Sequence, residues 1–321
     1  METEIKSIID CFAENFKKYG KKFYIHNIFL RRTAALLFAL HGRELPLERI
    51  NFYFDLIKKK TSAFSVFRWN FHFLLSALLA LEDRGKKSFE DVFRAYEDLK
   101  KAGFRRSPYL VLLAHYLVQK ADITNYGTLI KRSKIVYDGM KKNHRILTSQ
   151  WFYLSAGVLA ASENDAQLLL RKAEKHYRSL KKNFSASYQL LELAYVLCLY
   201  NDFFDVEKKV LKIKEHLNEK GLKIQRRIPL PLLGVLAFLP DESDKIANQL
   251  DFAYQQLLKH KPFNNLLVPK QEILTYAAAT VAWVHANAGD VQTSAVAFKD
   301  LIMTRLIQAI AVLSGEARAT Y

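Results

Sequence analysis

The sequence is poor in the residues that turn a chain sharply or cross-link it. It contains 11 glycines and 7 prolines among 321 residues, which argues against the turn-rich composition of most all-β folds. Its two cysteines, Cys11 and Cys198, form no Cys-x-x-Cys pair and are too few for a disulfide framework. These shortages argue against a turn-rich all-β fold and predict a protein of a reducing compartment.

Long hydrophobic runs are missing as well. The densest apolar stretch, IPLPLLGVLAFLP at 228–240, is too short and too rich in proline to span a bilayer. Residues 1–20 have an amphipathic pattern and lack the basic start and apolar core of a secretory signal. We therefore expect a soluble chain without a transmembrane segment.

The motifs of common catalytic sites are also absent. None of the nine histidines lies three or four positions from another, which excludes a helical metal-binding pair such as His-Glu-x-x-His. There is no Gly-x-Gly-x-x-Gly, Walker or Gly-x-Ser-x-Gly motif. Cys198 lies in a strongly apolar run, which favours a structural thiol over a nucleophile. The sequence thus predicts no catalytic residue, no metal and no cofactor, although residues distant in sequence could still meet in an enzyme site.

What the sequence does contain is a repeated helix motif. Residues 96–104, YEDLKKAGF, carry an aromatic residue, a leucine three positions later, two lysines and a Gly-Phe pair. Similar segments recur at intervals of roughly 40 residues, and a denser apolar segment follows each of them. The pattern predicts units of one apolar and one amphipathic helix, with Gly103 and Gly221 in the left-handed conformation that ends a helix. The Leu or Met anchors of the motif are at positions 56, 99, 140, 180, 217 and 257.

Two-helix units of this period are typical of an α-solenoid built from HEAT-like repeats. We therefore predict an all-α fold in which residues 29–288 form about six such repeats of roughly 40 residues each. Residues 1–28 are expected to supply an N-terminal capping helix. Residues 289–321 are expected to supply a C-terminal capping helix and a short tail.

The chain is strongly basic, with 49 Lys and Arg against 32 Asp and Glu and a net charge of +17. This balance favours an acidic partner, such as nucleic acid, an anionic membrane surface or an acidic protein. Stacked repeats would align the basic residues that follow each anchor into one stripe. The candidates for binding a polyanion are Lys58, Lys59, Lys100, Lys101, Arg105, Arg106, Lys141, Lys142, Lys181 and Lys182.

Acidic residues gather instead in the turns that lead from each apolar helix to the next amphipathic one. Examples are Asp83, Asp122, Glu163, Asp202 and Asp205. Helix capping and complementation of helix dipoles would explain both sets of charges without any ligand. A phosphate-binding stripe is the alternative, and no base-reading motif accompanies it. Both interpretations stay open.

The stretch MKKNHRILTSQW, at 140–151, departs from the repeat. His144 and Arg145 replace the Gly-Phe or Asn-Phe pair of other units, and Thr148 and Ser149 precede Trp151, which opens the next apolar helix. A serine or threonine N-cap explains this arrangement. The alternative is that these five residues form a small polar or anion-binding site at a helix N-terminus.

Three segments, YEDLKKAGFRRSPYLVLLA, YDGMKKNHRILTS and IPLPLLGVLAF, resemble an uncharacterised bacterial family, domain of unknown function four thousand and three. Met140, Lys141, His144, Leu147 and Thr148 match a Met-Lys-x-x-His-x-x-Leu-Thr block of that family. The blocks occur in order and at the right spacing. The resemblance implies a cytoplasmic protein of Gram-positive-type bacteria, and it implies no activity and no functional residues.

A repeat without a catalytic constellation favours a non-enzymatic scaffold or adaptor that binds another macromolecule, with a protein as the expected partner. The alternative is a nucleic-acid-binding protein that places the lysine stripe on phosphates. An enzyme with a site near His144 is a third hypothesis. The sequence leaves the oligomeric state open.

Overall fold

The computed structural model describes residues 1–19, 26–69, 71–82, 85–120, 126–162, 164–200, 206–222, 230–289, 291 and 295–313, without the side chains of 295–297. These residues form α-helices and short 3-10 helices, and none of them lies in a β-strand. The predicted all-α class is therefore confirmed.

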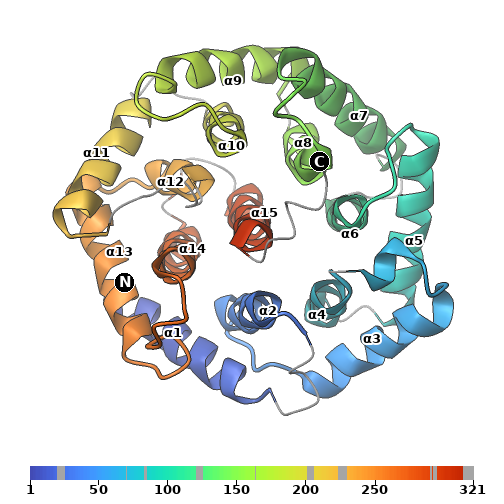
Figure 1. Ribbon diagram of the computed structural model, residues 1–321, viewed down its shortest axis with the longest axis horizontal. Coiled ribbons are helices and arrows are strands. Elements are labelled where there is room, and N and C mark those ends of the chain that lie inside the picture. The colour runs from blue at the N-terminus through green and yellow to red at the C-terminus, as the bar shows by residue number, and fades with distance from the viewer. Residues whose placement is uncertain are drawn as a thin grey trace.

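The helices alternate between an inner and an outer ring, and a last helix lies on the axis (Figure 1). The inner helices are α2 (Ile28–Leu40), α4 (His72–Glu82), α6 (Pro108–Lys120), α8 (Tyr153–Ala161), α10 (Tyr188–Leu197), α12 (Leu230–Ala237) and α14 (Lys270–Ala288). The outer helices are α1 (Glu2–Lys17), α3 (Leu47–Lys60), α5 (Lys86–Lys101), α7 (Tyr126–Asn143), α9 (Ala166–Leu180), α11 (Val206–Glu219) and α13 (Ser243–Leu258). The axial helix is α15 (Ala295–Leu313), and two 3-10 helices, η2 (Val66–Arg68) and η3 (Gln150–Phe152), precede α4 and α8.

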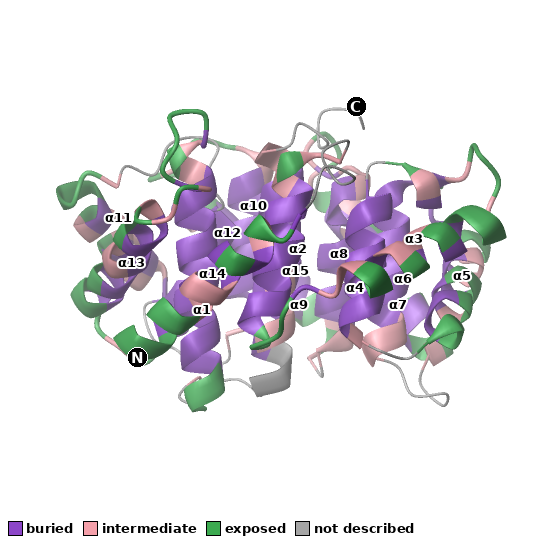
Figure 2. Ribbon diagram, turned by 90° about the horizontal axis from the view of Figure 1, so that it is seen from below, coloured by how far each residue is buried: buried purple, intermediate pink, exposed green. Residues whose placement is uncertain are grey.

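The two rings follow from the two kinds of helix in the sequence. Inner helices are buried on nearly every side, whereas outer helices bury one face and expose the other (Figure 2). In α5, for example, Tyr96 and Leu99 of the repeated motif are both buried, because residues three apart share a helix face. The motif ends as predicted, since Gly103 follows α5 with a φ of +90° and Gly221 follows α11 with a φ of +73°.

Small residues let the inner helices approach closely. A Cβ atom added to Gly157 in α8 would lie 2.4 Å from Cδ1 of Leu113 in α6. A Cβ atom added to Gly234 in α12 would lie 2.7 Å from Cδ1 of Leu193 in α10. Both distances are far below van der Waals contact, so a larger residue at either glycine would push neighbouring inner helices apart.

The solenoid of about six HEAT-like repeats predicted from the period is not confirmed, and the described helices close into a ring. Helix α1 packs mainly against α2 and also against α13 and α14, so the first outer helix lies beside the last outer and last inner helices. Phe12 of α1 contacts Phe263 and Tyr276, with ring centroids 4.6 and 5.2 Å apart. A sequence period defines the repeating unit but not the rotation from one unit to the next, which decides between an open and a closed array.

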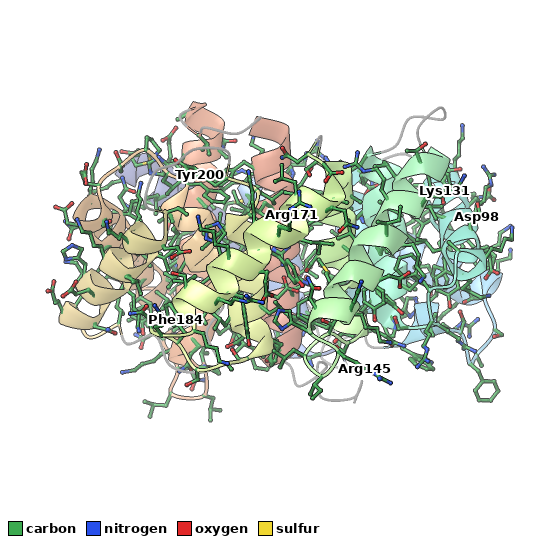
Figure 3. The ribbon with its side chains drawn as sticks, turned by 90° about the horizontal axis from the view of Figure 1, so that it is seen from above. Asp98, Lys131, Arg145, Arg171, Phe184 and Tyr200 are labelled. Carbon is green, nitrogen blue, oxygen red and sulfur yellow. The ribbon has the colours of Figure 1, made fainter. Side chains whose placement is uncertain are left out.

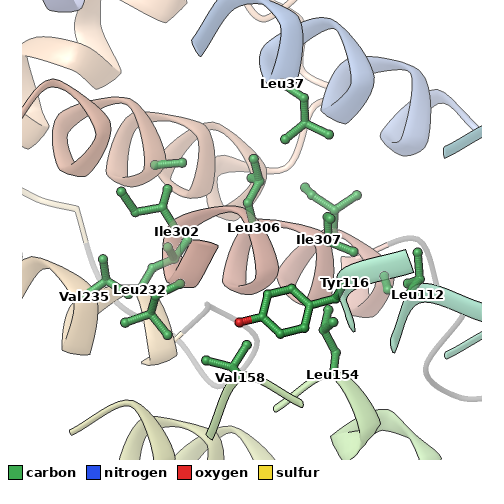
Figure 4. Close-up of a cluster of buried hydrophobic side chains, with 14 of the residues drawn as sticks. Leu37, Leu112, Tyr116, Leu154, Val158, Leu232, Val235, Ile302, Leu306 and Ile307 are labelled. Carbon is green, nitrogen blue, oxygen red and sulfur yellow. The ribbon is translucent and has the colours of Figure 1, made fainter. Parts of the chain in front are cut away.

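Helix α15, expected as a terminal cap, lies inside the ring and packs against α2, α8, α12 and α14. Its apolar face meets a cluster of side chains from the inner helices (Figure 4). Its one fully buried cation, Arg305, donates hydrogen bonds to Gln308 and Ser155 and pairs with Glu192 of α10. The division of the chain at residues 28 and 288 stays a prediction.

Candidate interaction face

The first turns of the inner helices lie on one face of the ring. A chain of aromatic contacts joins them: Phe71 to Tyr109 at 5.4 Å, Tyr109 to Trp151 at 5.6 Å, and Trp151 to Tyr188 at 6.1 Å between ring centroids. These four residues stand at the starts of α4, α6, α8 and α10. The turns that lead from outer to inner helices therefore share this face.

The outer-to-inner stretches of the sequence are residues 18–27, 61–71, 102–107, 144–152, 181–187, 220–229 and 259–269, and we call those of their residues that the structure describes the basic face. None of these stretches of sequence contains an Asp or Glu residue. In contrast, every stretch of sequence that links an inner helix to the next outer helix, or to α15, contains at least one Asp or Glu residue. These inner-to-outer stretches are residues 41–46, 83–85, 121–125, 162–165, 198–205, 238–242 and 289–294. In Figure 3, Arg145 and Phe184 lie toward one edge of the ring and Tyr200 and Lys131 toward the other.

Serine and asparagine cap the helical segments that begin on the basic face, namely α2, α6, α10 and the 3-10 helix η3 before α8. The side chains of Asn27, Ser107, Ser149 and Ser187 accept hydrogen bonds from backbone N–H groups two or three residues ahead, at 2.9 to 3.3 Å. On the opposite face Asp165 makes the same kind of cap for α9, at 2.8 Å. Asp caps a helix as well as Ser does and also complements the helix dipole, so capping alone does not account for the missing carboxylates. Of the acidic residues expected in the opposite turns, Asp83, Asp122, Glu163, Asp202 and Asp205 lie outside the described residues.

The predicted lysine stripe falls at the ends of the outer helices, but its members differ in how far they are neutralised. Lys100 pairs with Glu97 and Lys101 with Asp98 of the same helix, each at 2.9 Å. Lys58 lies over the ring of Phe54, 4.7 Å from its centroid. These three cations have local partners, which weakens the case that they wait for a ligand.

The later lysine pairs are more available. Lys142, Lys181 and Lys182 are exposed and Lys141 is half-buried. Within the described part of the chain none of the four pairs with a carboxylate, and the same holds for exposed Lys59. They are the predicted residues best placed to meet an external anion.

Arg105 and Arg106 are exposed in the turn between α5 and α6. The guanidinium of Arg106 lies 5.7 Å from the ring centroid of Trp69 and donates a hydrogen bond to the backbone oxygen of Phe64. The turn between α3 and α4 is thereby tied to its neighbour around the ring. The backbone N–H of Arg105 donates to the hydroxyl of Tyr153, at 3.1 Å.

The five residues of the junction at 140–151 serve different purposes. His144 Nε2 lies 2.7 Å from a carboxylate oxygen of Glu174, and Arg145 is exposed. The hydroxyl of Thr148 donates to the backbone oxygen of Met140, at 3.2 Å, and Ser149 is the N-cap already described. Trp151 is buried in the inner ring. The geometry thus supports the capping interpretation and places no converging set of free polar groups here.

A cavity of about 290 Å³ lies between α15 and the inner helices, and sequence reasoning did not find it. His115 pairs with Glu82, and Lys120 with Asp300 of α15. Burial raises the pKa of Asp300 above its ordinary value. These residues come from three helices far apart in sequence, so no local motif announces them. Lys120 and Asp300 neutralise each other, and His115 contacts the Glu82 carboxylate, which argues against a poised acid or base.

Membrane-spanning helices and metal-binding clusters are both missing from the described residues. None of their helices combines the length and the hydropathy that crossing a bilayer requires. No group of three or more His, Cys, Asp or Glu side chains among them is arranged to hold a metal ion.

Comparison with known proteins identifies relatives without an assigned activity. Residues 15–310 match the model of a family described as protein of unknown function, DUF4003. The chain is 24% identical over 275 residues to an uncharacterised protein, YeaA, of Bacillus subtilis strain 168. The matched region covers 81% of this chain and 82% of the relative. No solved structure matches.

Proposed function

The chain belongs to the DUF4003 family of unknown function, and we propose that it is a non-enzymatic helical adaptor that binds an anionic macromolecular surface in the cytoplasm through its basic face. The observation that carries the proposal is the complete lack of Asp and Glu in the outer-to-inner turns. Inner helices begin at these turns, and a helix N-terminus favours a carboxylate. The absence of carboxylates there runs against the local preference and supports selection for an uninterrupted positive surface.

The unpaired lysines make this surface available to a partner. Lys141 and Lys142 lie in the last turn of α7, and Lys181 and Lys182 directly follow the neighbouring outer helix α9. The four lysines therefore border the same part of the basic face, where their fields add. The Debye length is about 8 Å at physiological ionic strength, which lets close cations act together and screens distant ones. The proposal therefore predicts binding that weakens steeply as salt is added.

A charge-reversal experiment with a matched control tests the proposal. The test variant changes Lys141, Lys142, Lys181 and Lys182 to Glu. The control variant also changes four exposed cations to Glu, but these lie near the starts of outer helices, toward the opposite face. They are Lys86, Lys87, Lys131 and Arg171. Both remove the same amount of charge from the net +17.

The readout is affinity for a heparin oligosaccharide at low and moderate salt. We expect the test variant to lose on the order of tenfold or more in affinity and to show a shallower salt dependence, because fewer counterions are released per binding event. The control should lose much less. An equal loss in both variants would mean that net charge alone drives binding, and the proposal would be wrong.

Nucleic acid is the alternative anion, and the paired lysines at the outer-helix ends favour it. Successive phosphates of a backbone would meet successive lysine pairs, without any reading of base edges. Duplex DNA in place of heparin tests this alternative. Tight binding to DNA that falls with salt and is lost in the charge-reversal variant would support it.

A further inference from the structure

The basic face also carries the most exposed hydrophobic side chains of the described chain. Phe64 is 84% exposed, Ile146 91%, Leu266 105% and Leu267 87%. The next large hydrophobic residue among those described, Ile135, is 51% exposed. All four of the most exposed residues lie in outer-to-inner turns, where none would be expected on a surface evolved only to hold a polyanion in water.

We propose that the anionic partner is the surface of a lipid bilayer, on which the basic face docks while Phe64, Ile146, Leu266 and Leu267 insert among the lipids. This inference rests on the proposed function and names its partner class. Basic side chains beside apolar ones are the combination that holds a protein at an anionic membrane interface. The cations attract the headgroups, and the apolar side chains leave water.

The four apolar side chains proposed to insert, which we call the tips, are spread around the ring. Phe64 lies between α3 and α4, Ile146 between α7 and α8, and Leu266 and Leu267 between α13 and α14. These helices occupy three separate parts of the ring in Figure 1. Three points on one face of a ring define a plane, and a bilayer is a plane that can receive all of them together. A nucleic-acid rod would cross only part of such a face and would leave its apolar tips in water.

Each tip is held by a buried anchor. In the turn that carries Leu266 and Leu267, Phe263 and Val268 on either side are buried in the core. The side-chain oxygen of Asn265 accepts a hydrogen bond from the N–H of Leu267 at 3.0 Å. The two leucines are therefore presented to solvent by a fixed turn.

The other tips are anchored in the same way. Phe67 is buried three residues after Phe64, and Thr148 is buried two residues after Ile146. The carbonyl of Phe64 also receives the hydrogen bond from Arg106 that ties its turn to the next one. Fixed apolar tips lose little conformational freedom on insertion, which favours their use as membrane anchors.

Cations flank every tip. Arg145 precedes Ile146 directly, and Lys261 and Lys270 lie on the two sides of the leucine turn. Arg106 lies beside Phe64. A juxtaposition of this kind lets one contact supply both headgroup attraction and hydrophobic burial.

Vesicle sedimentation with the full chain tests the inference. The probes are vesicles of phosphatidylcholine mixed with phosphatidylserine, and vesicles of phosphatidylcholine alone. One variant changes Phe64, Ile146, Leu266 and Leu267 to Ser. A matched pair of single variants, Ile146→Ser and Ile135→Ser, compares the same residue type in the turn after α7 and on the side of α7. Circular dichroism and the unfolding midpoint establish that each variant folds.

We expect binding to the mixed vesicles and little binding to the neutral ones. Partitioning onto the mixed vesicles should fall at least about tenfold in the variant with all four tips changed and about three- to tenfold in Ile146→Ser. The reason is that each serine gains little free energy from leaving water, whereas the apolar side chain that it replaces gains much more. Ile135→Ser should bind as the parent does. Affinity for the heparin oligosaccharide should stay unchanged in all of these variants, because their charge is unaltered.

The outcomes separate this inference from the proposed function. Binding to heparin with no binding to mixed vesicles, or vesicle binding that the tip variant retains, would overturn the inference and leave the proposed function standing. DNA binding that is tighter than vesicle binding would have the same consequence. No binding to heparin or to mixed vesicles at low salt would overturn both.

Discussion

Arg32 on α2 and Glu272 on α14 form a buried ion pair, in which Nη1 of the arginine lies 3.1 Å from both carboxylate oxygens. The residues are 240 positions apart in sequence. Tyr276 donates a hydrogen bond to the same carboxylate at 2.6 Å, and Arg32 donates a second one to the backbone oxygen of Pro262 at 3.3 Å. The pair therefore joins the first inner helix to the last one and marks the point at which the ring closes.

Removing one partner of this pair should destabilise the fold. Arg32→Met leaves the Glu272 carboxylate buried without its cation, and we expect the free energy of unfolding to fall by about 3–5 kcal/mol. The double variant Arg32→Met/Glu272→Met should recover part of that loss, because no buried charge remains. Urea unfolding measures both. A single variant as stable as the parent would show that the closure does not depend on this pair.

Two glycines of the same outer helix should respond in opposite ways to alanine. A Cβ atom at Gly139 of α7 would lie 2.3 Å from Cδ1 of Leu170 in α9, whereas nothing lies within 4 Å of one at Gly127. Gly139→Ala should cost about 1–3 kcal/mol by overpacking. Gly127→Ala should stabilise the helix by up to about 1 kcal/mol. Thermal and urea unfolding give both values, and similar effects at the two positions would contradict the packing of α7 on α9.

His72 should make stability depend on pH. Its ring stacks on Phe54, with centroids 3.8 Å apart, and Nε2 lies 3.0 Å from the Phe54 backbone oxygen. Burial lowers the pKa of His72 from 6.5 to about 4. Between these values the unfolded chain binds a proton that the folded chain does not, so the free energy of unfolding should fall as pH drops from 6.5 toward 4.

His72→Gln, which keeps an N–H donor, should flatten this dependence. The control is His216→Gln, because His216 is partly exposed at the surface and contacts Glu219 of its own helix at 3.1 Å. Urea unfolding at several pH values gives the slopes. A slope that His72→Gln leaves unchanged would mean that other groups carry the effect, among them His26 and His41, whose pKa values partial desolvation also lowers.

The local features of the fold could be predicted from the sequence because they depend on neighbours along the chain. The alternation of apolar and amphipathic helices follows from the spacing of apolar residues. The helix end at Gly103 follows from its freedom at positive φ. The charge difference between the two kinds of turn is also legible in the sequence.

The closure of the ring and the place of α15 could not be predicted in the same way. Both depend on contacts such as Arg32 with Glu272, or Arg305 with Glu192, between residues more than a hundred positions apart. The exposed tips were missed for a related reason. Nothing local distinguishes Ile146, which is exposed, from Phe104, which is buried after the preceding outer helix.

One measurement tests the membrane-facing basic face most directly. Of the three tryptophans, Trp69 lies on the basic face and is 49% exposed, whereas Trp151 and Trp283 are 5% and 3% exposed. Mixed phosphatidylcholine and phosphatidylserine vesicles with brominated acyl chains should therefore quench the fluorescence of Trp69 and shift its emission to shorter wavelength. Trp69→Phe should bind the vesicles and lose most of this response. Vesicle binding without quenching, or the same quenching in Trp69→Phe, would show that another part of the protein meets the bilayer.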